Sequence, residues 1–203
     1  MGIPLFFLFL TWRALLIPLP RQEGAHHLYT TAGRDDLKRL ILSLIESATK
    51  SLDIYTYQLT DKDVTRLIEA KAAAGVTIRI ATDKGEKKRL PRGTQRLERG
   101  SKGLMHEKLL LIDGKRLCIG SANLTPPSLT MHDNTLLVIE DAPLTQALTL
   151  NTPTTSYRRL PAADGLATLL ESLKTAEISL DIALFTFTHP ALCQELINAH
   201  QRG

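Results

Sequence analysis

The stretch HEKLLLIDGKRLCIGSAN, residues 106–123, contains the turn from which the fold of this chain can be interpreted. Asp113 and Gly114 stand near its centre, and this dipeptide is typical of tight turns between antiparallel strands. Apolar residues dominate on both sides of the turn, as they do in strands that are buried within a sheet. We therefore expect a β-hairpin whose strands cover residues 109–112 and 116–121.

Polar residues gather at the open end of this predicted hairpin. His106 and Lys108 stand two positions apart before the first strand, so their side chains leave the same face. Ser121 and Asn123 end or follow the second strand, which returns beside the start of the first. The four side chains are therefore predicted to lie near one end of adjacent strands. An imidazole that can act as a nucleophile is thus combined with three groups suited to holding a phosphate.

The sequence before the hairpin alternates between helix and strand patterns. After Asp35, apolar residues recur every three or four positions, which marks one face of an amphipathic helix. Asp61 is suited to cap a second helix and Gly75 to end it. The predicted elements are a helix over 35–48, a strand over 51–59, a helix over 61–74 and a strand over 76–81, followed after the hairpin by a strand over 134–140 and a short helix capped by Asp141.

A strand, a helix and a strand with short connections favour parallel strands joined by a right-handed crossover. We therefore predict an α/β protein, built as an α/β/α sandwich with a mixed, mostly parallel sheet.

A second copy of the opening pattern begins near residue 164. Residues 179–182 read Ser-Leu-Asp-Ile, as residues 51–54 do, at a displacement of 128 positions. In both copies the pattern follows a predicted helix, a strand is expected over 179–187 as it is over 51–59, and Gly203 falls where Gly75 ends the first crossover helix. Because the repeated residues occur within the same order of helix and strand patterns, they indicate an internal duplication. The predicted organisation is an apolar N-terminal segment and linker (1–31), a complete half (32–150), a linker (151–163) and the truncated start of a second half (164–203).

Composition and charge narrow the class of partner without choosing one. The 203 residues are 43% hydrophobic, which is enough for a folded core, and they carry a net charge of +4. Basic residues outnumber acidic ones in the irregular stretch 84–102, just before His106. Such a stretch suits an anionic partner, either a nucleic acid or an acidic lipid surface. It contains no aromatic residue, so it lacks the stacking platform of a dedicated single-strand binder.

The N-terminal segment leaves several interpretations open. Residues 1–20 are largely apolar but are interrupted by Arg13, and the apolar stretch is short for a membrane span. The charged start and small-residue cleavage pattern of a signal peptide are poor. The segment is either an export signal, a short membrane anchor or an apolar arm, and the first two predict an exported or membrane-associated protein. Residues 21–31 are predicted to form a polar linker.

The pattern His106-x-Lys108, four residues, Asp113, six residues and Gly-Ser-x-Asn resembles the signature of the phospholipase D superfamily. The resemblance implies an α/β/α sandwich, two such halves meeting at one site, and phosphodiester cleavage without a metal ion or other cofactor. The roles it implies are a nucleophile or its acid/base partner for His106, phosphate binding for Lys108, Asn123 and, to a lesser degree, Ser121, a supporting role for Asp113, and orientation of the histidine for Asp133.

The chain departs from this family pattern in having one signature where most members have two. One imidazole cannot conveniently act as nucleophile and as leaving-group acid on opposite sides of a phosphorus atom. A second histidine is therefore expected from the partner in a homodimer. His132, His189 and His200 lack comparable neighbours in the sequence and are interpreted as non-catalytic.

Three functions follow from these observations. The first is a phospholipase D-like phosphodiesterase that hydrolyses phospholipids through a phosphohistidine intermediate and needs a dimer partner. The second is an endonuclease of the same superfamily, for which the basic stretch argues. The third is an inactive fragment of a two-signature enzyme, for which the incomplete second half argues.

Overall fold

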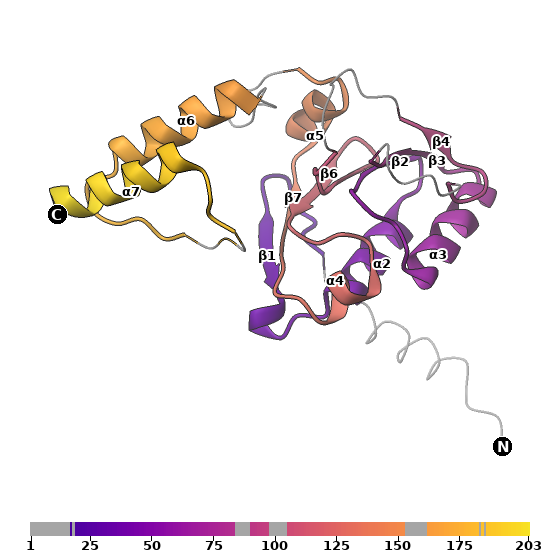
Figure 1. Cartoon of the computed structure of the whole chain (residues 1–203). Helices are drawn as coiled ribbons and strands as arrows, with labels where there is room; N and C mark the ends of the chain where they lie inside the picture. The colour runs from indigo at the N-terminus through magenta and orange to yellow at the C-terminus, as the bar shows by residue number, and fades with distance from the viewer. Residues whose placement is uncertain are drawn as a thin grey trace. The chain divides into compact units, whose positions relative to one another are not determined.

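The computed structural model describes residues 17, 19–83, 90–97, 105–152, 162–182, 184 and 186–203. It divides into two compact units, Met1–Ser156 and Tyr157–Gly203, coloured from indigo to orange and from orange to yellow in Figure 1. The division falls within the linker predicted over 151–163. Each unit has its own packing and is described separately.

The first unit is built on a seven-stranded sheet in the order β1-β7-β6-β5-β2-β3-β4. The strands are β1 (His26–Thr30), β2 (Ser51–Tyr55), β3 (Thr77–Ala81), β4 (Gln95–Arg96), β5 (Leu109–Ile112), β6 (Arg116–Gly120) and β7 (Thr135–Glu140). Strand β3 pairs in parallel with β2 and β4, whereas the other four pairings are antiparallel.

The predicted mixed sheet is thus confirmed, but its balance needs correction, because antiparallel pairs predominate. The physical reason lies in the connections. A hairpin turn joins β5 to β6, and such a short connection reverses the chain direction, whereas a parallel pair needs a crossover such as the helix between β2 and β3.

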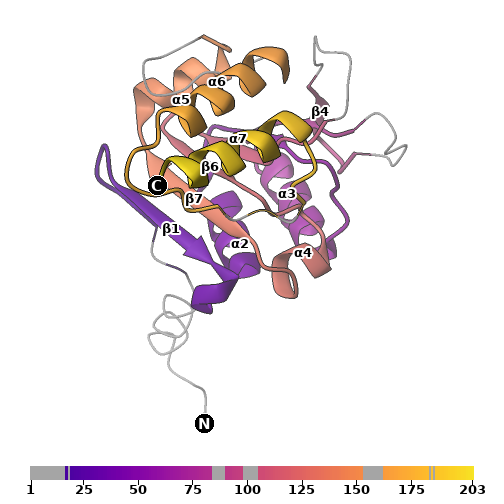
Figure 2. The same cartoon turned by 60° about the vertical axis from the view of Figure 1, so that its left-hand side comes forward.

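Helices cover both faces of the sheet and confirm the predicted α/β/α sandwich. In Figures 1 and 2, α2 (Leu37–Ser47), α3 (Lys62–Ala73) and α4 (Pro126–Thr130) lie on one side, and α5 (Ala142–Thr149) lies on the other. A short 3-10 helix, η1 (Thr31–Gly33), precedes α2. The predicted caps are present: Asp61 accepts hydrogen bonds from the first turn of α3, and Asp141 accepts one from Leu144 in α5.

The main core lies between the sheet and the face covered by α2, α3 and α4. Alternate residues of the strands point into it, so that Leu52 and Ile54 of β2 are buried while the next strand along supplies Ile78 and Ile80. Each such side chain contributes about 1.5–3 kcal/mol relative to an exposed position. At the margin of this core, Arg116 and Glu140 form a buried ion pair with a nitrogen–oxygen distance of 2.6 Å.

One strand lies where the sequence predicted only a linker. Residues 26–30 form β1, which pairs with β7 at the edge of the sheet. Only Tyr29 of this strand is buried, so the strand carries almost no apolar pattern, and backbone pairing with β7 holds it in place. Of the apolar N-terminal segment, residues 1–16 and 18 lie outside the described part, whereas Ile17 and Leu19 pack against the core.

The second unit contains two helices, α6 (Ala162–Lys174) and α7 (Pro190–Arg202), which pack together. Arg202 bonds the carbonyl oxygen of Leu173 at 2.9 Å and the carboxylate of Glu195 at 3.1 Å. The strand predicted over 179–187 is not formed in the described residues of that range. Strands need hydrogen-bonded neighbours, and no described segment of this unit lies alongside as a strand.

Within the described residues, no helix is long and apolar enough to cross a membrane.

Candidate active site

The candidate site lies where β2 and β6 end and β5 begins. His106 and Lys108 come just before β5, and the backbone N–H of Gly120 donates to the carbonyl oxygen of Lys108 at 3.2 Å. This bond continues the β5–β6 ladder beyond the last paired residues of β5. It brings the His-x-Lys segment beside the Gly-Ser-x-Asn segment, as the hairpin predicted.

Lys108 supplies a cation held close to the backbone of the site. The residue is 9% exposed, and its Nζ donates to the carbonyl oxygen of His106 at 2.8 Å. Burial lowers the pKa of Lys108, because the charged ammonium loses contact with water. One backbone carbonyl accepts one of its three protons, and among the residues that the structure describes no hydrogen bond engages the other two, which can donate to an anion.

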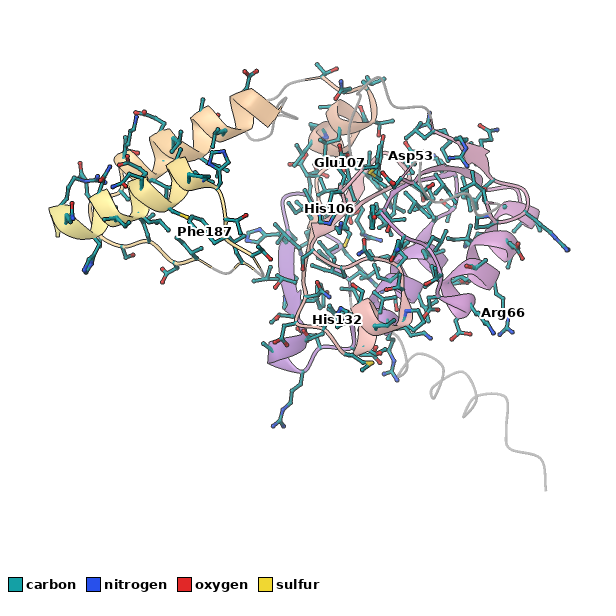
Figure 3. All side chains as sticks on the ribbon, in the orientation of Figure 1. Asp53, Arg66, His106, Glu107, His132 and Phe187 are labelled. Carbon is teal, nitrogen blue, oxygen red and sulfur yellow. The ribbon has the colours of Figure 1, made fainter. Side chains whose placement is uncertain are left out.

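His106 is adapted to be neutral near pH 7. Burial lowers the pKa of its imidazole, and the positive charge of Lys108 lowers it further. A neutral imidazole has a nitrogen lone pair, which is what attack on phosphorus requires. In Figure 3, His106 lies beside Glu107, while His132 lies well apart from both.

Tyr57 is a neighbour of both residues that the sequence did not single out. Its ring centroid lies 5.8 Å from that of His106, with the planes tilted by 54°, and 6.0 Å from Nζ of Lys108. The aromatic ring therefore packs against the imidazole and faces the cation at the outer limit of a cation–π contact. The sequence signal was its position just after the buried strand β2.

The loop after β2 also holds the segment that carries Asn123. Leu124 donates to the carbonyl oxygen of Gln58 at 3.1 Å, and its own carbonyl accepts from Thr60 at 2.9 Å and from Asp61 at 3.1 Å. These bonds attach the end of the Gly-Ser-x-Asn segment to the β2–α3 loop. Asn123 therefore lies between the end of β6 and a residue bonded to the loop after β2, the two strands that flank β5 in the sheet.

Asn123 and Ser121 differ in how their side-chain oxygens are hydrogen-bonded. The side-chain oxygen Oδ1 of Asn123 is buried and has no hydrogen-bond partner among the residues that the structure describes. Ser121 Oγ, in contrast, donates to Oδ1 of Asn134 at 2.8 Å and accepts from the N–H of Thr135 at 3.0 Å. The single hydroxyl proton of Ser121 is therefore engaged with protein in this geometry.

Asp113 follows the end of β5 that is opposite to His106, about 23 Å along an extended chain at about 3.3 Å per residue. Its carboxylate accepts hydrogen bonds from the backbone N–H groups of Thr49, Lys50 and Ser51 and from the Thr49 hydroxyl. Burial alone raises the pKa of this carboxyl, but these bonds outweigh it and leave the pKa lowered. Its predicted part in catalysis stays a prediction, while in the structure the Asp113 carboxylate connects the β5–β6 turn to the start of β2.

Asp133 remains a prediction as the residue that orients the histidine. It is exposed, and among the described residues no hydrogen bond or ion pair joins it to His106. Its neighbour Asn134, which the sequence did not single out, is buried and contacts the segment that holds Ser121 and Asn123.

Two further predictions concern charge and metals. Of the basic stretch 84–102, residues 84–89 and 98–102 lie outside the described part, and Arg92 and Arg96 are exposed beside the edge strand β4. In the described part of the chain, no group of three or more His, Cys, Asp or Glu side chains is arranged to hold a metal ion.

Comparison with known proteins places this geometry in a family. Residues 41–151 match the family described as "Cardiolipin synthase, PLD-like domain". Since this match covers more than half of the chain, the protein belongs to this family of phospholipase D-like domains.

Individual relatives agree with this assignment. The chain is 26% identical over 121 residues to a protein named Phospholipase D from Rickettsia bellii, across 56% of this chain and 60% of that one. It is 29% identical over 133 residues to a Cardiolipin synthase from Geobacillus thermodenitrificans, across 57% of this chain and 26% of the other. The chain thus spans between about a quarter and three fifths of these curated relatives.

Among solved structures, the chain is similar to Nuc from Salmonella typhimurium, a phospholipase D family member. The TM-score is 0.56 at 22% identity, across 63% of this chain and 91% of that one. At this identity the likeness shows a shared fold. It agrees with the α/β/α sandwich described above.

Proposed function

We propose that this chain is a phosphodiesterase that hydrolyses phospholipid phosphodiester bonds through a covalent phosphohistidine at His106. The observation that carries the proposal is the pairing of His106, whose pKa is lowered, with the buried ammonium of Lys108. The neutral imidazole supplies the nucleophile, and the ammonium beside it supplies a positive charge for the phosphate oxygens. Attack on a phosphodiester anion requires both.

The reaction follows from the roles of these groups. A lone pair of the His106 imidazole forms a bond to phosphorus, and the bond from phosphorus to the leaving alcohol oxygen breaks. Lys108 and the Nδ2 group of the Asn123 carboxamide donate to the non-bridging oxygens, and the positive charge of Lys108 balances their negative charge. A proton donor supplies the departing alkoxide with its proton. Water then attacks the phosphorus, gives a proton to the now deprotonated donor, and breaks the bond from phosphorus to the imidazole, which releases the phosphate monoester.

A second copy of the chain is proposed to provide that proton donor. The full sequence contains one His-x-Lys pattern, at His106 and Lys108. In a homodimer that joins two sites, one His106 attacks while the His106 of the partner protonates the leaving group on the opposite side. This arrangement predicts that specific activity rises with protein concentration through the dimer dissociation constant.

The choice of lipid rests on the relatives and on the N-terminus. Relatives across more than half of this chain carry the names Phospholipase D and Cardiolipin synthase. The largely apolar residues 1–20 also suit contact with a membrane surface.

An endonuclease is the second candidate function. The exposed Arg92 and Arg96 favour it, because cations on the protein surface attract a polyphosphate backbone.

One comparison of substrates separates the candidates. Full-length wild type, His106→Ala and His132→Ala are incubated with phosphatidylcholine or cardiolipin vesicles and, in parallel, with supercoiled plasmid, while sedimentation velocity gives the oligomeric state. His132 is a matched control because it is exposed and lies outside the site.

We expect vesicle hydrolysis by wild type and His132→Ala and none by His106→Ala. Cleavage of plasmid alone, lost in the same variant, transfers the proposal to the endonuclease. A folded wild-type protein without turnover on either substrate supports the inactive fragment.

A further inference from the structure

A buried asparagine connects Ser121 and Asn123, the two polar residues of the Gly-Ser-x-Asn segment. Asn134 is 9% exposed and stands just before β7, on the strand adjacent to β6. It belongs neither to the His-x-Lys pair nor to the Gly-Ser-x-Asn segment. Its side chain nevertheless bonds both to Ser121 and to the residue that holds Asn123.

The bonds of Asn134 run in defined directions. Its Oδ1 accepts the hydroxyl proton of Ser121 at 2.8 Å. Its Nδ2 donates to the carbonyl oxygen of Ser128 at 2.8 Å and lies 3.2 Å from the Ser128 hydroxyl oxygen. Because the Ser128 carbonyl can only accept, the nitrogen of the carboxamide must face it, and the oxygen must face Ser121.

Ser128 passes this constraint to Asn123. The backbone N–H of Asn123 donates to Oγ of Ser128 at 2.8 Å, so this hydroxyl oxygen receives bonds from Asn123 and from Asn134. Ser128 is 5% exposed and lies in the first turn of α4, which is capped by Thr125. The Ser128 hydroxyl therefore fixes the backbone from which the Asn123 side chain projects.

The backbone of Asn134 is itself anchored. Its N–H donates to the Thr31 hydroxyl at 2.9 Å, and its carbonyl accepts from the N–H of Thr31 at 3.1 Å. These two bonds fix the backbone of Asn134 against Thr31, the residue that follows β1. They therefore fix the point from which the carboxamide projects. A side chain held in this way can serve as a rigid support for its neighbours.

We propose that Asn134 is a positioning residue for the proposed phosphodiesterase reaction, acting through Ser128 on Asn123 and directly on Ser121. Its bond to Ser121 occupies the only proton of that hydroxyl, so Ser121 supports the site and Asn123 is the phosphate ligand of the pair. The inference rests on the proposed function. In this proposal, a hydrogen-bonded network of Asn134, Ser128 and Ser121 fixes the position of the Asn123 side chain that binds the phosphate.

An isosteric pair of variants at Ser128 tests the network. Ser128→Thr keeps the hydroxyl and adds a methyl group, whereas Ser128→Val has nearly the same shape without the hydroxyl. Any cost of the extra methyl in this buried position is common to both, so their difference reports the hydroxyl. Ser128→Ala, which adds no bulk, serves if neither larger side chain is accommodated.

Two readouts are measured on full-length protein: turnover of bis(p-nitrophenyl) phosphate and the affinity for inorganic phosphate by calorimetry. We expect kcat/KM of Ser128→Val to fall about tenfold to a hundredfold below that of Ser128→Thr, with weaker phosphate binding, because a small displacement of a ligand is costly in catalysis. Asn134→Leu is expected to match Ser128→Val, and thermal unfolding shows that each variant is folded.

The outcomes separate the two proposals. Equal kcat/KM and equal phosphate affinity in folded Thr and Val variants, or in the folded Ala variant and wild type, overturn the positioning role. If wild type shows no turnover but phosphate binds more weakly to Ser128→Val than to Ser128→Thr, the positioning role is supported and the proposed hydrolysis is overturned. A folded wild type that shows neither turnover nor phosphate binding overturns both.

Discussion

Substitution of Gly120 by alanine connects the fold to the site in one measurement. A Cβ at this position would lie 2.0 Å from the carbonyl oxygen of Thr135 and 3.0 Å from Cα of Leu136, whereas ordinary contacts begin at 3.4 Å. Both atoms belong to the backbone of β7, so no side-chain rotation relieves the contact. The strand must move, and the Thr135 carbonyl is the group that accepts from the N–H of Ser121 at 3.0 Å.

The expected cost combines two effects. Overpacking against backbone costs about 1–3 kcal/mol, and weakening the Ser121 bond costs about 1 kcal/mol more. Gly120→Ala is therefore expected to lower the free energy of unfolding by about 2–4 kcal/mol, measured by urea denaturation with circular dichroism.

Gly33→Ala is the matched control for this substitution. Its added Cβ lies 3.1 Å from the end of the Thr30 side chain, which can move, so we expect a change within about 1 kcal/mol. If Gly120→Ala proves as stable as Gly33→Ala, the close approach of β6 and β7 beside the site is not a feature of the folded protein.

Three further predictions concern charged groups. Because the pKa of His106 is lowered and the neutral form is the nucleophile, kcat/KM should rise with pH through a midpoint below 6.5, and an acid midpoint above 6.5 contradicts the assigned role. At higher pH kcat/KM should fall, as the partner's His106, which is the proposed proton donor, and then Lys108, whose pKa is also lowered, lose their protons. Glu140→Ala leaves Arg116 buried without its carboxylate partner and should lower the free energy of unfolding, measured by urea denaturation, by about 3–5 kcal/mol. The double variant Arg116→Met/Glu140→Leu should recover most of that loss. If the stability of Glu140→Ala is unchanged, the buried ion pair is not a feature of the folded protein. Asp113→Asn should lower the free energy of unfolding at pH 7. Because the pKa of Asp113 in the folded protein lies below its ordinary 3.8, the difference in unfolding free energy between wild type and variant should shrink as pH falls below 3.8 through the folded value. A difference that does not change with pH argues against the bonds to residues 49–51.

Between Asp35 and Glu140, a helix or strand could be predicted wherever its apolar residues recur with the period of that element and the face they form is buried. The helix that begins at Leu37 buries one complete face, and the hairpin around Asp113 is determined by a turn whose two residues have positive φ angles of 54° and 65°. Strand β1 was missed because its pairing depends on backbone groups and buries only Tyr29. The strand over 179–187 was wrongly expected because the pattern describes the segment alone, while a strand exists only beside another strand.

The site was predictable to the extent that its geometry is local. The two-residue spacing of His106 and Lys108 and the hairpin turn together predicted that the two halves of the motif meet. Asn134 and Tyr57 were not predicted as site residues, because their contacts join segments far apart in the chain. The engagement of the Ser121 proton was likewise invisible, since it depends on which neighbour faces the hydroxyl in the folded protein.

The central claim is that His106 is the nucleophile of a phosphodiesterase. The most direct measurement is mass spectrometry of full-length protein quenched in alkali during turnover of bis(p-nitrophenyl) phosphate, because alkaline conditions preserve phosphorus–nitrogen bonds. We expect a phosphoryl-ester adduct on the peptide that contains His106, present in His132→Ala and absent in His106→Ala. Turnover that continues in His106→Ala, or an adduct on a different residue, would contradict it.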